Sequence, residues 1–250
     1  MMLVIIGGIF MASVLSGCET KGKAELEQSF DKVLSVYPTK NLLDFYDMEG
    51  YRDDEFDKDD KGVWSLISSM NIAQTKESPM YSEGMVLRMN RNTRTAKGYF
   101  YQSMYAKDIE DDTEERFPVT YDENGFHLTN EVSDPKLKEK ILNFQFFVQY
   151  GSFEKLDRYE NIKKMYNPEV PMYNLEYRLT NDDANVNELR KRYDIPTEEA
   201  PTLSLSGRGD LEGSSVGAKE LTFQFSKDPS VYYRASIDYQ RSSEEDMTNE

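Results

Sequence analysis

The residue types that most often perform chemistry are scarce in this 250-residue chain, which contains one cysteine, Cys18, and one histidine, His127. A single thiol cannot form a disulfide within the chain, and one Cys with one His cannot build a zinc cluster. Catalysis by a serine or cysteine with a histidine base would have to use His127. This residue follows the turn-forming residues 123–125 at the start of a short predicted strand, so we interpret it as structural. The sequence therefore predicts no catalytic, cofactor-binding or metal-binding site.

Cys18 lies directly behind an apolar run without charge, residues 1–15. The run is shorter than a membrane-spanning helix requires and ends in small residues, as a processed signal peptide does. Residues 15–18, Leu-Ser-Gly-Cys, fit the bacterial lipobox, in which the cysteine thiol accepts a diacylglyceryl group before cleavage. We predict a signal peptide over residues 1–17 and a lipidated tether over residues 18–23. Two acyl chains anchor a protein stably, so we expect the body on the extracellular face of the cell membrane.

A second short motif, Arg208-Gly209-Asp210, lies in the predicted loop between strands at Leu203 and Leu221. In other proteins this tripeptide binds host integrins, where the Arg meets an acidic groove and the Asp completes the coordination of a metal. An exposed loop on a surface-anchored protein suits such contact, although three common residues also occur together by chance. We keep the motif as a candidate partner-binding loop, with a host-cell surface protein as the expected partner.

Two patterns suggest an ion or a nucleotide but fit neither. The acidic run at residues 53–61 lacks EF-hand spacing, because Lys61 and Ser68 occupy liganding positions, so we expect a solvated loop. The glycines at 207, 209 and 213 are spaced one residue too widely for a dinucleotide fingerprint. We predict no cofactor on this basis.

Clusters of cations and of aromatic residues also have simple structural explanations. The adjacent cations of residues 190–192 point in different directions on a helix, which favours a solvated surface over a phosphate clamp. The aromatic runs at residues 99–101 and 232–233 suit the core and rim of a sheet better than a platform for sugar or lipid.

The overall charge excludes one class of partner. With 30 Lys and Arg against 46 Asp and Glu, the formal net charge is −16. A chain this acidic is not expected to attract the phosphate backbone of a nucleic acid. We therefore expect no nucleic-acid binding. A carboxylate-based hydrolase of cell-wall glycans remains an alternative, but nothing singles out a catalytic pair among the acids.

Hydrophobic periodicity predicts more strands than helices. Helical spacing predicts helices near residues 26–37, 42–46, 135–150 and 185–193. Alternating apolar residues predict strands near residues 85–89, 99–105, 117–121, 126–128, 173–179, 203–205, 221–225 and 231–239. Consecutive strands with short turns favour an α+β fold, an antiparallel β-sheet built from hairpins with several helices packed on it. We assign residues 24–241 to this single domain and residues 242–250 to a flexible acidic tail.

Five long stretches resemble the staphylococcal tandem-type lipoproteins, a family also called conserved staphylococcal antigen. The matching stretches are residues 37–53, 82–99, 143–153, 179–201 and 213–217. The resemblance implies a lipid-anchored surface protein without enzymatic activity. It also implies contact with host cells, through immune stimulation by the lipidated terminus and promotion of host-cell entry. Of the family's functional residues, only the lipobox cysteine corresponds, at Cys18, and members more often lack Arg-Gly-Asp at residues 208–210.

Two function hypotheses follow. The first is a non-enzymatic surface lipoprotein, anchored through diacylated Cys18, whose body contributes to host interaction. The second is an envelope-associated binding module for a small apolar ligand or lipid, because an antiparallel sheet with helices on one face can enclose a cavity. The sequence does not indicate an oligomeric state.

Overall fold

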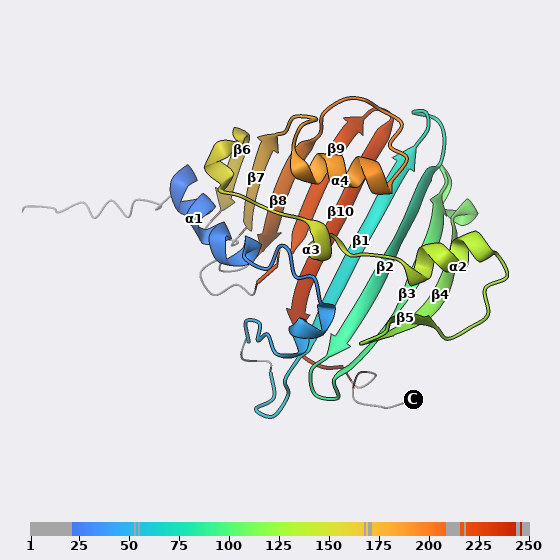
Figure 1. The fold of residues 1–250 in the computed structure, drawn as a ribbon. Coiled ribbons are helices and arrows are strands. Elements are labelled where there is room, and N and C mark those ends of the chain that lie inside the picture. Colours follow the sequence, from blue (N-terminus) through green and yellow to red (C-terminus); the bar gives the residue numbers. More distant parts are fainter. Residues whose placement is uncertain are drawn as a thin grey trace, which may run out of the picture.

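The computed structural model describes residues 22–52, 54, 56–167, 169, 172–208, 216, 217, 219–243 and 246. Helices and strands alternate in groups along the chain (Figure 1). In chain order the elements are α1 (Lys23–Leu34), η1 (Leu42–Tyr46), β1 (Val63–Ala73), β2 (Met80–Asn90), β3 (Thr95–Tyr105), η2 (Ile109–Asp111), β4 (Thr113–Asp122), β5 (Gly125–Leu128), α2 (Pro135–Leu142), α3 (Phe147–Tyr150), η3 (Leu156–Arg158), β6 (Glu160–Asn167), β7 (Met172–Arg178), α4 (Ala184–Arg192), β8 (Thr202–Arg208), β9 (Glu220–Lys227) and β10 (Ser230–Gln240).

The strands form one 10-stranded antiparallel sheet in the order β5-β4-β3-β2-β1-β10-β9-β8-β7-β6. Within β1–β5 and within β6–β10, each strand pairs with the next strand of the chain, as short turns favour. β1 and β10 join these two halves, with Trp64 opposite Tyr239 and Ile72 opposite Val231. The first and last strands of the chain therefore lie at the centre of the sheet.

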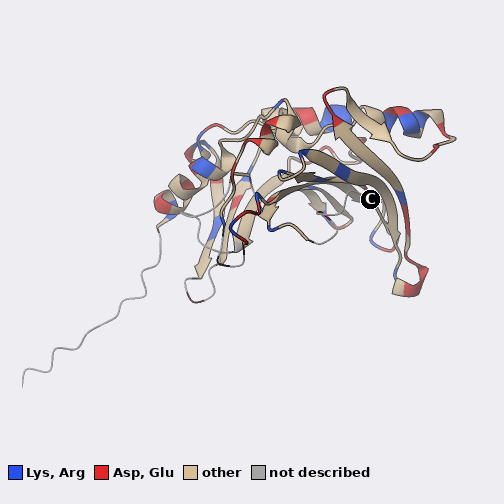
Figure 2. Ribbon diagram, turned by 90° about the horizontal axis from the view of Figure 1, so that it is seen from below, with Lys and Arg blue, Asp and Glu red and all other residues tan. Residues whose placement is uncertain are grey.

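The helices gather on one side of this sheet, which we call the helix-side face, and the opposite side is the open face (Figures 1 and 2). On β1, Trp64, Leu66 and Met70 point to the helix-side face and are buried. Ser65 and Ile67 alternate with them and point to the open face. The predicted antiparallel sheet with packed helices is confirmed, but the chain is mostly β, with 42% of residues in strands and 22% in helices.

The amino-terminal helices pack as the apolar spacing predicts. Leu26, Phe30 and Val33 of α1 are buried on one stripe. The helix ends at Leu34, three residues before the predicted end, although Tyr37 is also buried. Phe45 of η1 packs edge-on against Trp64, with ring centroids 5.3 Å apart. These contacts fix the start of the chain over the sheet.

The prediction of one helix from Pro135 to Tyr150 is wrong. α2 ends at Leu142, and α3 begins only at Phe147, after a non-helical Phe146 whose N–H donates to Gln149 Oε1 at 2.9 Å. The break lets Phe144 pack against Phe100 while Phe146 packs against Phe126. Packing of aromatic side chains in two directions therefore overrides the helical spacing.

Local signals were also misjudged at two other places. The first turn of α4 is capped by Asp183, whose carboxylate accepts from the N–H groups of Asn185 and Val186, so the helix begins at Ala184, one residue before the predicted start. β6 was not predicted at all, because it is an edge strand with mostly exposed side chains and no apolar alternation. Its pairing with β7 is what places it in the sheet.

Candidate functional site

The predicted site residues lie at or beyond the margins of the described structure. Cys18 lies outside the described residues, as do Gly209 and Asp210. The backbone of Arg208 ends β8 and pairs with Met172 on β7. In the described part of the chain, no helix is long and apolar enough to span a membrane. The lipidation site and the Arg-Gly-Asp loop therefore stay predictions from the sequence.

Asp60, near the end of the acidic run and close to the start of β1, forms a structural clamp. Asp60 accepts hydrogen bonds at 2.8 Å from the Gly62 N–H, from Asn92 Nδ2, and from both the N–H and the hydroxyl of Ser242. Partial burial would raise the pKa of Asp60, but these hydrogen bonds outweigh it and lower the pKa to about 2. Within the described ranges, no three His, Cys, Asp or Glu residues are grouped as metal ligands.

Two contacts hold the beginning of the predicted flexible tail against the end of the sheet where Asp60 lies. Ser242 binds Asp60, as described above. The Asp246 carboxylate accepts from Arg88 Nε at 3.1 Å and from Arg88 Nη2 at 2.7 Å on the open face. Flexibility of the tail beyond these contacts stays a prediction.

His127 and the cation cluster have structural contacts. His127 Nε2 lies 2.8 Å from Asp122 Oδ1 across the β4–β5 hairpin, where both side chains are about half exposed. Arg190 donates to the carbonyl oxygens of Thr197 and Glu199 and so fixes the loop after α4. Arg192 instead stacks over the Tyr150 ring, 4.0 Å from its centroid. Arg190 and Arg192 thus have different structural partners, whereas Lys191 and Arg192 both pair with Glu188.

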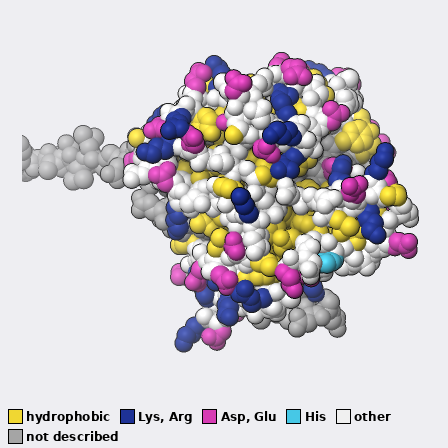
Figure 3. Space-filling model, in the orientation of Figure 1, with side chains coloured by type: hydrophobic (Ala, Val, Ile, Leu, Met, Phe, Trp, Pro, Cys, Tyr) yellow, Lys and Arg dark blue, Asp and Glu magenta, His cyan; other side chains and the backbone are white. Residues whose placement is uncertain are grey.

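A groove of about 1000 Å³ lies on the helix-side face of the described structure. It lies over the upper halves of β1–β4 in Figure 1, between the end of α2 and the end of α4. Hydrophobic side chains reach the surface there beside the cations of α4 (Figure 3). Its floor includes the apolar side chains Met70, Ile72, Phe100, Met104 and Phe144. This size is at the upper end of the range of about 300–1000 Å³ for small-molecule sites.

A row of polar side chains crosses this apolar floor. Strand register places Met70 opposite Glu83, Glu83 opposite Gln102, and Gln102 opposite Glu115. Glu83 accepts from Lys140 Nζ at 2.7 and 3.0 Å, and from Gln102 Nε2 at 2.9 Å. The groove therefore combines an apolar floor with hydrogen-bonding groups in fixed positions, as ligand sites do.

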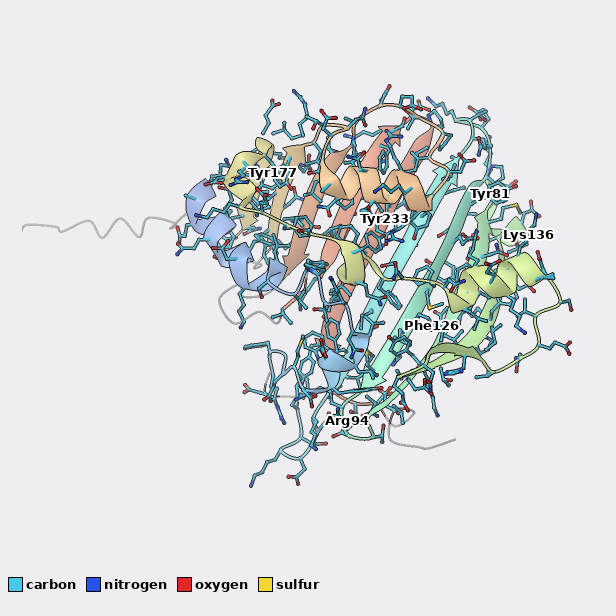
Figure 4. All side chains as sticks on the ribbon, in the orientation of Figure 1. Tyr81, Arg94, Phe126, Lys136, Tyr177 and Tyr233 are labelled. Carbon is cyan, nitrogen blue, oxygen red and sulfur yellow. The ribbon has the colours of Figure 1, made fainter. Side chains whose placement is uncertain are left out.

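Three tyrosines support the wall of the groove beneath α4: Tyr233, which is buried, and Tyr150 and Tyr193, which are partly buried. The Tyr150 and Tyr233 hydroxyls are 3.2 Å apart, and the Tyr193 and Tyr233 rings are 5.3 Å apart. Burial raises the pKa of all three hydroxyls well above the ordinary value. Figure 4 shows Tyr233 beneath α4, whereas Tyr81 at the far end of the groove lies clear of the helices. The tyrosines thus stay neutral and hold the end of α4 against the sheet.

Sequence reasoning missed the groove and its polar row. Glu83, Gln102 and Glu115 occur in different strands, and only the register of two successive hairpins brings them side by side. The available signal was the alternation itself, since Glu83 falls on the same face as the apolar residues Met85, Leu87 and Met89.

Comparison with known proteins identifies the family. The model of the Csa1 family matches residues 22–242 of the chain. An uncharacterized lipoprotein of Staphylococcus aureus strain USA300 is 49% identical over 249 residues, covering 96% of this chain and 97% of its own length. Another from strain N315 is 50% identical over 237 residues, covering 93% of this chain and 92% of its own length. The predicted resemblance is thereby confirmed, and the chain belongs to the Csa1 family of staphylococcal lipoproteins.

Proposed function

We propose that this protein is a non-enzymatic surface lipoprotein, anchored through diacylated Cys18 to the extracellular face of the cell membrane. The observation that carries the proposal is the Leu-Ser-Gly-Cys motif, which ends four residues before the described fold begins at Gly22. Its relatives are named lipoproteins, which agrees with this anchor. A short tether keeps the body close to the membrane surface.

The body contributes to host contact in this proposal. Family resemblance supports roles in immune stimulation and host-cell entry, the first through the acylated terminus. A host-cell surface protein is the expected partner of the body, with Arg208, Gly209 and Asp210 as the candidate loop. β8 leads directly into this loop, and β9 resumes the sheet at Glu220.

The anchor is tested by growing bacteria that carry the full chain with an alkyne-labelled fatty acid. The chain should take up label and sediment with membranes, whereas Cys18→Ala should lose the label and appear in the culture fluid. Ser16→Ala, which keeps a small residue two positions before the cysteine, is the matched control and should behave like the parent. Equal membrane retention of Cys18→Ala would contradict the proposal.

Host contact is tested with the same strains on epithelial cells. Bacteria with the parent chain should adhere more than bacteria with Cys18→Ala, because only the former display the body. Asp210→Glu keeps the charge but displaces the carboxylate, so its effect reports on the Arg-Gly-Asp loop alone. Unchanged adhesion in Asp210→Glu would exclude the loop, and unchanged adhesion in both variants would exclude the anchored body.

The groove favours a second candidate function, an envelope-associated module for a small apolar ligand or lipid. Its floor of Met, Ile and Phe side chains offers apolar contact, and the exposed Tyr81 extends the floor toward solvent. Native mass spectrometry of the chain released from membranes should then detect a bound apolar molecule. A matched Phe100→Ser variant, which makes the floor polar, should carry less of it, while Phe225→Ser outside the groove should not lose it selectively.

A further inference from the structure

We propose that the groove between α2 and α4 binds a cationic amphiphile, with its apolar chain on the Met–Ile–Phe floor and its ammonium group at the carboxylates of Glu83 and Glu115. This inference rests on the role of the groove as a ligand site and names the chemical class of the ligand. Four observations carry it: the apolar floor, the balance of charge, the position of Glu83 and the unpaired state of Glu115.

The balance of charge in the groove is acidic once its internal ion pairs are considered. Three lining carboxylates face the groove, those of Glu83, Glu115 and Asp194, together with three cations. Glu188 of α4 adds a fourth carboxylate beside these cations, whereas Glu114 lies opposite Ser103 on the open face. Lys191 and Arg192 both pair with Glu188, at 2.7 and 3.3 Å, and Lys140 pairs with Glu83. Each of these cations therefore has a carboxylate partner, although Lys191 and Arg192 share the single charge of Glu188. With Glu115 and Asp194 included, the sum of these charges is −1, which favours a cationic over an anionic ligand headgroup.

Glu115 is available to a ligand. It faces Gln102 in the register of β3 and β4 and lies on the groove lining. In the part of the chain that the structure describes, no cation or hydrogen-bond donor contacts its carboxylate. Its neighbour Glu114, in contrast, is bound by Arg116 and by Ser103. Glu115 thus leaves one negative charge beside an apolar floor without a partner.

Glu83 can supply a second contact to the ligand ammonium by exchanging it for Lys140. Its Lys140 partner is about half exposed and reaches across from α2 on a flexible stem. A ligand ammonium can replace Lys140 at Glu83 while Lys140 turns to water, so the carboxylate keeps a cationic partner throughout. Gln102 keeps the Glu83 carboxylate in place during this exchange. The net charge of −16 for the whole chain further attracts a cation to this surface.

The test uses photoreactive probes on membranes that carry the full lipidated chain. Three probes share one alkyl chain with a diazirine and differ only in a trimethylammonium, carboxylate or hydroxyl head. Crosslinks are mapped by mass spectrometry and expressed as the ratio of groove peptides to open-face peptides of the same chain, which cancels differences in membrane partition. The ammonium probe should favour the groove over the hydroxyl probe by about tenfold, as expected for one added charge pair.

Single substitutions locate the charge effect. Glu115→Gln should lower the ammonium preference severalfold and leave labelling by the hydroxyl probe unchanged. It breaks no side-chain hydrogen bond or ion pair among the described residues. Glu83→Gln should have a similar effect. Glu176→Gln, which removes a carboxylate bound to Lys163, is the matched control away from the groove and should leave the preference intact.

The outcomes separate this inference from the module on which it rests. Equal labelling of the groove by all three probes overturns the cationic ligand but leaves an apolar-ligand site. A preference for the carboxylate probe, or an ammonium preference that survives both Glu83→Gln and Glu115→Gln, also overturns it. Absence of groove labelling by every probe overturns both the inference and the module.

Discussion

The two ends of the helix-side face carry the same kind of side chain but are covered differently. At the start of β1, Trp64 is 0% exposed beneath Phe45 of η1, and Tyr239 packs 4.8 Å from it. At the other end of the same strands, Tyr81 is 52% exposed above the groove. The difference comes from the covering elements, because η1 and the following loop close one end while α2 and α4 leave a gap at the other.

This contrast shows what strand alternation determines. An apolar alternation decides which face of a strand is apolar, but helices and loops from elsewhere decide whether that face is buried. An apolar strand end that the fold leaves open is therefore a candidate binding surface. Substitutions at the covered end can therefore be compared with substitutions at the open end of the same strands.

The largest effect should come from removing the centre of the covered end. Trp64→Ala should lower the free energy of unfolding by about 3–5 kcal/mol, because it leaves a cavity beneath Phe45 and removes the indole hydrogen bond to Met48 O at 3.1 Å. Tyr81→Ala, at the open end, should cost less than about 1 kcal/mol. Urea unfolding followed by circular dichroism in a Cys18→Ala background measures both. Equal costs would mean that the groove is closed in solution.

Two glycines test how tightly the covered end is packed. Gly62 has φ 73°, and a Cβ there would lie 2.6 Å from Tyr239 Cζ. Gly125 also has positive φ, 101°, but a Cβ there would meet nothing within 4 Å. Gly62→Ala should therefore destabilise the fold by about 2–3 kcal/mol and Gly125→Ala by about 1 kcal/mol. Thermal or urea unfolding of the pair measures the contribution of the clash, and equal costs would show that Tyr239 moves aside readily.

A smaller effect is expected at the Asp60 clamp, and it depends on pH. The folded pKa of about 2 is lower than the ordinary value of 3.8 for an aspartate, so the ionised carboxylate stabilises the fold fully above pH 3.8. This contribution falls as the pH drops from about 4 to about 2. Because Asp60 is partly exposed, Asp60→Asn should cost about 1 kcal/mol at pH 7. Unfolding curves at pH 7 and pH 2.5 should differ less in the variant than in the parent.

An appropriate control for this pH effect is Asp44→Asn, on η1 of the same end, for which no such set of side-chain partners is present in the described structure. Its unfolding curve should follow that of the parent at both pH values. An Asp60→Asn variant whose pH dependence matches the parent would assign the acid sensitivity to other carboxylates.

The sequence was sufficient for the elements whose partners are local. The hairpins β2–β3 and β4–β5 follow from alternation and from turn residues that lie between adjacent strands. The break between α2 and α3 could not be predicted, because it depends on ring contacts with partners distant in the chain. Phe144 packs against Phe100, and Phe146 packs against Phe126. The edge strand β6 lacks the alternation that identifies buried strands, and only β7 places it.

The candidate sites divide in the same way. The lipobox predicted at Cys18 is a contiguous motif of four residues, so the sequence alone suffices to predict it. The polar row Glu83–Gln102–Glu115 exists only through the pairing of three strands, and the groove exists only because helices 135–142 and 184–192 stop short of each other. No local sequence pattern predicts the pairing of these three strands or the gap between these two helices.

The smallest expected effect on stability is at Glu83. Its size distinguishes a carboxylate that supports the fold from one that is free to bind a ligand. The Glu83–Lys140 pair joins side chains that are 26% and 54% exposed, and such pairs contribute about 0–1 kcal/mol. Glu83→Gln should change the free energy of unfolding by less than about 0.5 kcal/mol in moderate salt, since an amide still bonds to Gln102. Lys140→Gln is the reciprocal variant and should match it.

Asp60 and Glu83 should differ in how much each contributes to the free energy of unfolding. Asp60 holds four donors at the covered end, so its removal should affect folding, whereas Glu83 holds a mobile lysine at the open end, so its removal should affect only what enters the groove. If urea unfolding shows a loss above about 2 kcal/mol for Glu83→Gln, the carboxylate is part of the scaffold. A ligand ammonium could not then replace Lys140 without cost, and the exchange at Glu83 would have to be abandoned in favour of Glu115 alone.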